Sequence, residues 1–129
     1  MSAVIRLLAI LCCILAITDS FRCKIIVRVT SKTDKKFKAL VVVPALGIRS
    51  QPMIFNGKTT KKVKVDGEEC GRKPWIIRTY KWKNNSWKPA RNMTAKLQGQ
   101  GWIRVVVRDD LRPAPLDRFG VMCSEGLCG

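Results

Sequence analysis

The chain has 129 residues, with 25 Lys and Arg, 9 Asp and Glu and no histidine, which gives a formal net charge of +16 at pH 7. The absence of histidine excludes Ser-His and Cys-His nucleophile pairs, two-histidine acid–base catalysis and histidine-ligated metal sites. We therefore expect a protein that is not an enzyme and uses no cofactor; a glycosidase-type carboxylate pair is the catalytic alternative. So large a charge favours polyanionic partners, and a merely basic, soluble surface is the alternative.

The first 20 residues have the layout of a secretory signal peptide. A basic residue precedes an uninterrupted apolar run, 7–17, and the small residues Thr18 and Ser20 follow it. The run is shorter than the roughly twenty apolar residues that a membrane span needs. We expect cleavage after Ser20, secretion, and one mature domain of residues 21–129.

Four cysteines remain after cleavage: Cys23, Cys70, Cys123 and Cys128. In a small secreted domain they predict two disulfides, for which three connectivities exist. We expect the pairs Cys23–Cys128 and Cys70–Cys123. A zinc site would need thiolates paired at close spacing, usually with histidine, so we expect no metal at these cysteines.

Along the mature chain the hydrophobic period is two residues, as in strands with one wet face. The segments 23–29, 62–65 and 102–108 alternate apolar residues with Lys or Arg. The run 40–43 is apolar throughout, which is typical of a strand buried on both sides, and 75–83 is rich in β-forming residues.

Turn signals separate these segments at 44–47, 56–57, 66–67, 71–74, 84–85, 99–101 and 113–115. The pairs Asn56-Gly57 and Asp66-Gly67 suit type I′ hairpins, because both central residues of that turn need positive φ. Short strands with frequent turns predict an all-β fold, a single antiparallel β-sandwich stabilised by two disulfides.

Two N-glycosylation sequons lie in the polar stretch between Lys83 and Thr94, with acceptors Asn84 and Asn92. We expect this stretch to be a surface loop that can carry N-glycans in a eukaryotic secretory pathway. The alternative is chance, since the sequon is short.

The segment 105–122 resembles the sixth strand, third loop and seventh strand of a C2 domain. An apolar strand ends at Asp109, and Asp117, Phe119 and Gly120 stand at the spacing of that family. The resemblance implies a C2-like sandwich with Asp109 and Asp117 as calcium candidates. Leu111 stands where the middle calcium-binding Asp would be, so we expect no tight calcium site. The alternative is a β-hairpin whose Asp and Gly serve as turn residues.

These observations predict a secreted, non-enzymatic module that binds polyanions through basic strand faces. The predicted contact residues are Lys24, Arg28, Lys62, Lys64, Arg104 and Arg108. The expected partners are a sulfated glycosaminoglycan such as heparin or an anionic membrane surface, and secretion makes nucleic acid a less accessible one. A ligand or effector that recognises a receptor protein is the first alternative. A cationic antimicrobial protein with exposed tryptophans is the second, and the oligomeric state stays open.

Overall fold

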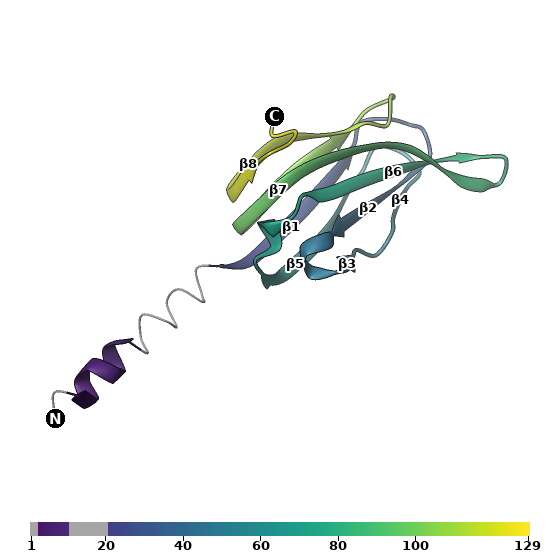
Figure 1. The fold of residues 1–129 in the computed structure, drawn as a ribbon. Coiled ribbons are helices and arrows are strands. Elements are labelled where there is room, and N and C mark those ends of the chain that lie inside the picture. The colour runs from purple at the N-terminus through teal and green to yellow at the C-terminus, as the bar shows by residue number, and fades with distance from the viewer. Residues whose placement is uncertain (1–2, 11–20) are drawn as a thin grey trace.

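The computed structural model describes residues 3–10 and 21–129 (Figure 1). Residues 3–10 form a short helix. Within the described residues, no helix has the length and apolar character needed to cross a membrane. Most of the predicted apolar run and the expected cleavage site after Ser20 lie in 11–20, outside the described residues, so the signal peptide stays a prediction.

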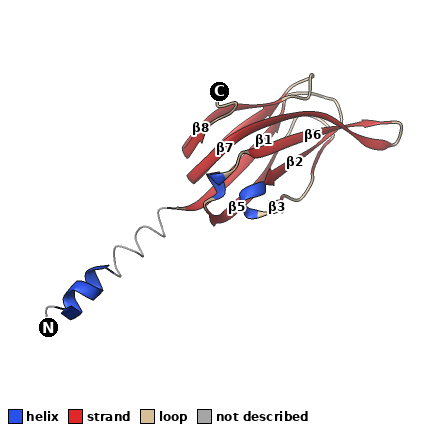
Figure 2. Ribbon diagram, viewed as in Figure 1, coloured by secondary structure: helices blue, strands red, loops and turns tan. Residues whose placement is uncertain are grey.

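From residue 21 onward the chain is built from strands, which confirms the all-β prediction (Figure 2). The strands are β1 (Arg22–Ser31), β2 (Phe37–Val43), β3 (Ile48–Arg49), β4 (Met53–Phe55), β5 (Thr60–Glu68), β6 (Trp75–Lys83), β7 (Ser86–Val107) and β8 (Pro113–Ser124). Two short 3-10 helices, η1 (Pro44–Leu46) and η2 (Cys70–Arg72), lie between them.

The long strand β7 belongs to two layers (Figure 1). Its first half pairs with β6, and β6 pairs with β2. Strand β2 also pairs with β3 and β4. We call this layer sheet B. The second half of β7 lies between β1 and β8, and β5 pairs with β1; we call this layer sheet A. The pairing of β1 with β7 is parallel, whereas the sequence analysis expected antiparallel pairs throughout.

The inner faces of the two sheets form one hydrophobic cluster. In β1 the period-two prediction is confirmed, because Ile25, Val27 and Val29 are fully buried while Lys24 and Arg28 face away from the core. The run 40–43 is buried except at Val42, which is half-buried. The inward side chains thus form the core, and the outward side chains of the strands are the ones available to bind a partner.

The predicted disulfide pairing is wrong: the bonds join Cys23 to Cys70 and Cys123 to Cys128. The end of β5 lies beside the start of β1, in the register Arg22 opposite Glu68, so Cys70 reaches Cys23 across one strand pair. Cys128 returns to Cys123 through a short turn after β8. Two disulfides indicate an oxidising, extracellular-type environment.

Several predicted turns lie inside strands. Asp66-Gly67 is part of β5 and pairs with β1, and neither Asn56 nor Gly57 has the positive φ of a type I′ turn. That geometry occurs at Asn84 and Asn85, with φ of 54° and 59°, which join β6 to β7. Asparagine tolerates the left-handed region better than other non-glycine residues, so an Asn-Asn pair can make this turn.

Candidate polyanion-binding face

The strand register of sheet A places three predicted basic residues side by side. Arg28 in β1 lies opposite Lys62 in β5 and opposite Arg104 in β7. All three belong to the outward face, so they form a row across three neighbouring strands, with strands spaced about 4.8 Å apart. We call Lys62, Arg28 and Arg104 the basic row.

Two more predicted residues flank this row, and one does not. Lys64 lies one outward position along β5 from Lys62, and Lys24 lies two outward positions along β1 from Arg28. Ile26, Lys62, Val63 and Lys64 line a depression of about 270 Å³. Arg108 follows the end of β7, in the loop before β8, and it is not in the row. Five of the six predicted side chains therefore share the outer face of sheet A.

The indole of Trp102 connects the two arginines of the row. The Cζ atoms of Arg28 and Arg104 lie 5.2 Å and 5.8 Å from the centroid of its ring. Cation–π contact at these distances restricts the guanidinium groups without neutralising their charge. Trp102 is half-buried, and the sequence analysis did not include it in the site. The alternation of 102–108 was the signal in the sequence, because it puts Trp102 on the same strand face as Arg104.

Strand β8 adds one acidic and two apolar side chains to the same face. Asp117 lies opposite Arg104, and its Oδ1 is 3.1 Å from the Arg104 Nε. Phe119 lies opposite Trp102, and Met122 lies opposite Gln98. Asp117 reduces the positive charge at one end of the basic row, whereas Lys24, Arg28, Lys62 and Lys64 form no ion pair with a described carboxylate.

A β-bulge determines how Phe119 is presented. Between matched pairs β7 advances three residues, from Gly99 to Trp102, while β8 advances two, from Val121 to Phe119. A Cβ at Gly101 would collide with the Phe119 carbonyl oxygen, and Gly99 has a φ of +123°. The predicted turn at 99–101 is thus a glycine bulge inside β7, of the kind that redirects side chains.

The two calcium candidates do not form a site together. Asp117 lies within β8 and pairs with Arg104, whereas Asp109 lies in the loop after β7, where its carbonyl oxygen accepts a hydrogen bond from the Lys35 Nζ at 2.9 Å. Among the described residues, no group of three or more His, Cys, Asp and Glu side chains is placed to hold a metal ion.

The outer face of sheet B carries a second cationic and aromatic cluster that the sequence analysis missed. The Lys36 Nζ lies 4.4 Å from the Trp82 ring centroid, and the Lys38 Nζ lies 4.6 Å from that of Tyr80. Trp82 and Trp87 meet edge to face at 4.9 Å. The alternation of aromatic and basic residues in 80–88 was the signal in the sequence.

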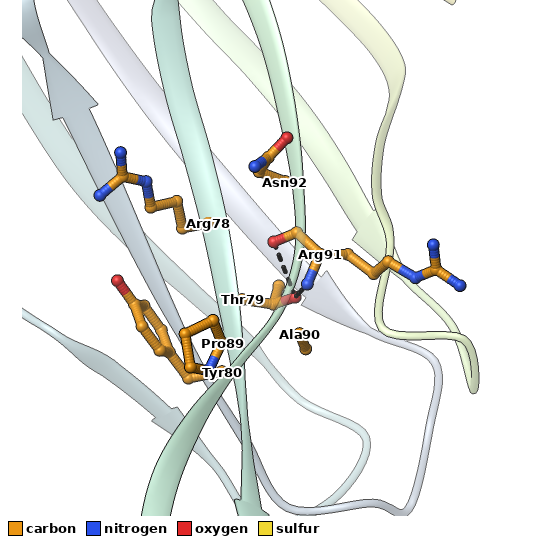
Figure 3. A pocket seen from close by; sticks show the side chains of 7 residues that line it. All are labelled: Arg78, Thr79, Tyr80, Pro89, Ala90, Arg91 and Asn92. Carbon is orange, nitrogen blue, oxygen red and sulfur yellow. Dashed lines mark hydrogen bonds between the residues drawn. The ribbon is translucent and has the colours of Figure 1, made fainter.

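A cavity of about 290 Å³ lies next to this cluster, at a second bulge between β6 and β7 (Figure 3). It is lined by Arg78, Thr79, Tyr80, Pro89, Ala90, Arg91 and Asn92. The buried Thr79 hydroxyl accepts from the Arg91 N–H at 3.2 Å and donates to the Leu111 carbonyl at 2.6 Å. These bonds tie the bulge to the loop before β8.

Both predicted glycan acceptors lie on the sheet B side. Asn84 lies in the turn between β6 and β7, which agrees with the predicted surface loop. Asn92 is exposed but belongs to β7, opposite Arg78, so the prediction of one continuous loop from 84 to 94 is wrong. The outer face of sheet A contains neither acceptor.

Comparisons with protein-family models, with curated protein sequences and with solved structures find no match to this chain. The resemblance of 105–122 to a C2 domain therefore stays a hypothesis. The surface chemistry of the two sheets is the remaining guide to function.

Proposed function

We propose that this protein is a secreted, non-enzymatic binding module that engages polyanions through the outer face of sheet A. The observation that supports it is the basic row, in which Lys62, Arg28 and Arg104 occupy adjacent strands at matching register. The two disulfides support a secreted protein, because such bonds persist in oxidising compartments.

The row has the chemistry that sulfate and phosphate groups require. Two guanidinium groups offer paired N–H donors, which can hold tetrahedral anions through charge-assisted hydrogen bonds. The contact of both groups with Trp102 reduces the rotamer freedom that binding would otherwise remove. Lys64 and Lys24 extend the positive surface from the row toward the start of β1.

The test compares two triple variants with the same net charge. The row variant is Arg28→Gln, Lys62→Gln and Arg104→Gln, and the control variant is Lys32→Gln, Lys58→Gln and Lys73→Gln, from exposed connecting segments. We expect the row variant to lose about tenfold or more in heparin affinity, as for one or two charge-assisted hydrogen bonds. We expect the control variant to change little.

Binding of the unmodified protein should weaken steeply with added salt, because exposed charges are screened over about 8 Å at physiological ionic strength. Equal losses from the two triple variants would mean that net charge alone attracts heparin. That result would contradict the assignment of a site to sheet A.

A further inference from the structure

The exposed apolar side chains of the folded domain gather on β8. Phe119 is 72% exposed, Met122 70% and Leu116 55%, more than any other large apolar residue from 22 onward. Single exposed apolar residues are ordinary, but a group on one strand indicates a contact surface. Strand β8 also lies at the edge of sheet A, since it pairs only with β7 among the described strands.

Two of these side chains lie on the same face as the basic row. The ladder places Phe119 next to Trp102 and Met122 next to Gln98, all on the outward side of sheet A. We call Trp102, Phe119 and Met122 the apolar band. On the outer face of sheet A, the basic residues therefore lie on β5, β1 and β7, with Asp66 and Glu68 at the far end of β5. The apolar band lies beside them on β7 and β8, next to the Arg104–Asp117 ion pair.

Backbone geometry and hydrogen bonds of β8 fix the position of the apolar band. The glycine bulge at 99–101 directs Phe119 outward, and Gly120 adopts a φ of +71° directly after it. The Arg118 guanidinium donates to the carbonyl oxygens of Val121 at 3.1 Å and Cys128 at 2.9 Å, and Cys128 is bonded to Cys123. An exposed strand fixed by these bonds presents its apolar side chains in one arrangement.

We propose that the polyanion bound by this face is an anionic membrane surface, an inference that rests on the proposed function of the basic row. Lys and Arg side chains near an anionic leaflet each contribute about 1 kcal/mol of attraction. Trp102, Phe119 and Met122 then enter the boundary between headgroups and acyl chains, where aromatic residues are favoured.

Charge argues against the other occupants of an apolar edge. A second copy of the chain would bring two domains of the same high positive charge together, and like charges at close range oppose such pairing. A sulfated glycan would use the basic row but would gain little from Met122 and Phe119. An anionic bilayer has negatively charged headgroups, which match the basic row, next to an apolar interior, which matches the apolar band.

The test uses vesicles of phosphatidylcholine, with and without phosphatidylserine, in a cosedimentation assay. The band variant is Phe119→Ser with Met122→Ser. The control variant is Ile48→Ser with Ile54→Ser, which removes two exposed apolar residues from β3 and β4 of sheet B. We expect the band variant to bind phosphatidylserine vesicles about tenfold more weakly, because each side chain loses part of its burial in the membrane. The control variant and heparin affinity should change little.

The outcomes separate this inference from the proposed function. Suppose that heparin binds through the basic row. The membrane inference alone would then be overturned if the unmodified protein did not bind vesicles, or if the band variant bound them as tightly as the unmodified protein. Equal loss of heparin and vesicle binding in the band variant would also overturn it. Self-association that the band variant abolishes would assign β8 to a second copy instead. Strong binding to pure phosphatidylcholine vesicles would contradict the role of the basic row as well.

Discussion

Trp102 is the residue on which the two parts of the sheet A face meet. Its ring contacts the guanidinium groups of Arg28 and Arg104 and lies opposite Phe119 in the ladder. Arginine stacks well on aromatic faces and keeps its donors free at the edge of the plane. One neutral side chain can therefore orient two charged ones, and its effect on binding can be measured without changing net charge.

The variant Trp102→Leu should bind heparin roughly threefold to tenfold more weakly, on the scale of one or two cation–π contacts. The matched control is Trp82→Leu, which removes a partly exposed tryptophan from the outer face of sheet B. Heparin affinity should be measured by calorimetry, with circular dichroism to check the fold. No difference between the two variants would mean that Trp102 does not position the row.

Among the elements, the alternation of apolar and basic residues predicted the strands well, whereas the Gly, Pro, Asn and Asp signals predicted the turns poorly. The odd positions of 23–29 and 103–107 are buried as expected, because alternation follows directly from strand geometry. The turns at 66–67, 99–101 and 113–115 failed because glycine and proline also occur at bulges and in edge strands. The disulfide pairing failed because the Cys23–Cys70 bond depends on which strands are neighbours, and local sequence does not contain that information. Once those two cysteines are bonded, the short-range pair Cys123–Cys128 is the one that remains.

The corrected pairing predicts unequal contributions from the two disulfides. Cys23–Cys70 closes a separation of 47 residues, whereas Cys123–Cys128 closes one of 5. By the loop-entropy model, Cys23→Ser with Cys70→Ser should cost about 4 kcal/mol of unfolding free energy. Removing the second bond in the same way should cost about 2 kcal/mol.

Denaturant unfolding of the two double variants would measure this difference. Peptide mapping under non-reducing conditions should first recover both bonds as the structure has them. A larger loss of stability from Cys123→Ser with Cys128→Ser than from the other pair would contradict the prediction. It would indicate that the turn after β8 contributes more to the fold than the link between β1 and η2.

At the scale of the whole molecule, acidic residues are distributed unevenly. The segments 35–65 and 70–108 contain no Asp or Glu, so β2, β3, β4, β6 and β7 contain no acidic residue. The polyanion partner was predicted from the net charge of +16, and the register brings five of the six predicted contact residues together on sheet A. The sequence did not predict Trp102, the apolar band or the Lys36–Trp82 cluster, because these depend on pairing between distant strands.

The two sheets therefore offer two different basic surfaces. Sheet A combines the basic row with the apolar band, whereas sheet B combines Lys36 and Lys38 with aromatic rings near both predicted glycan acceptors. A binding site on sheet A stays open whether or not Asn84 and Asn92 carry glycans, because neither acceptor lies on that face. This asymmetry adds to the basic row as a reason for proposing sheet A as the binding face.

The most direct test of that assignment is a residue-level map of polyanion contact. Isotope-labelled protein should be titrated with a short heparin oligosaccharide while backbone amide and tryptophan indole NMR signals are followed. We predict that the largest shifts fall on Arg28, Lys62, Arg104 and the Trp102 indole, with small changes at Trp82 and Trp87. Shifts centred on the sheet B tryptophans, or spread evenly over exposed lysines, would contradict a polyanion-binding face on sheet A.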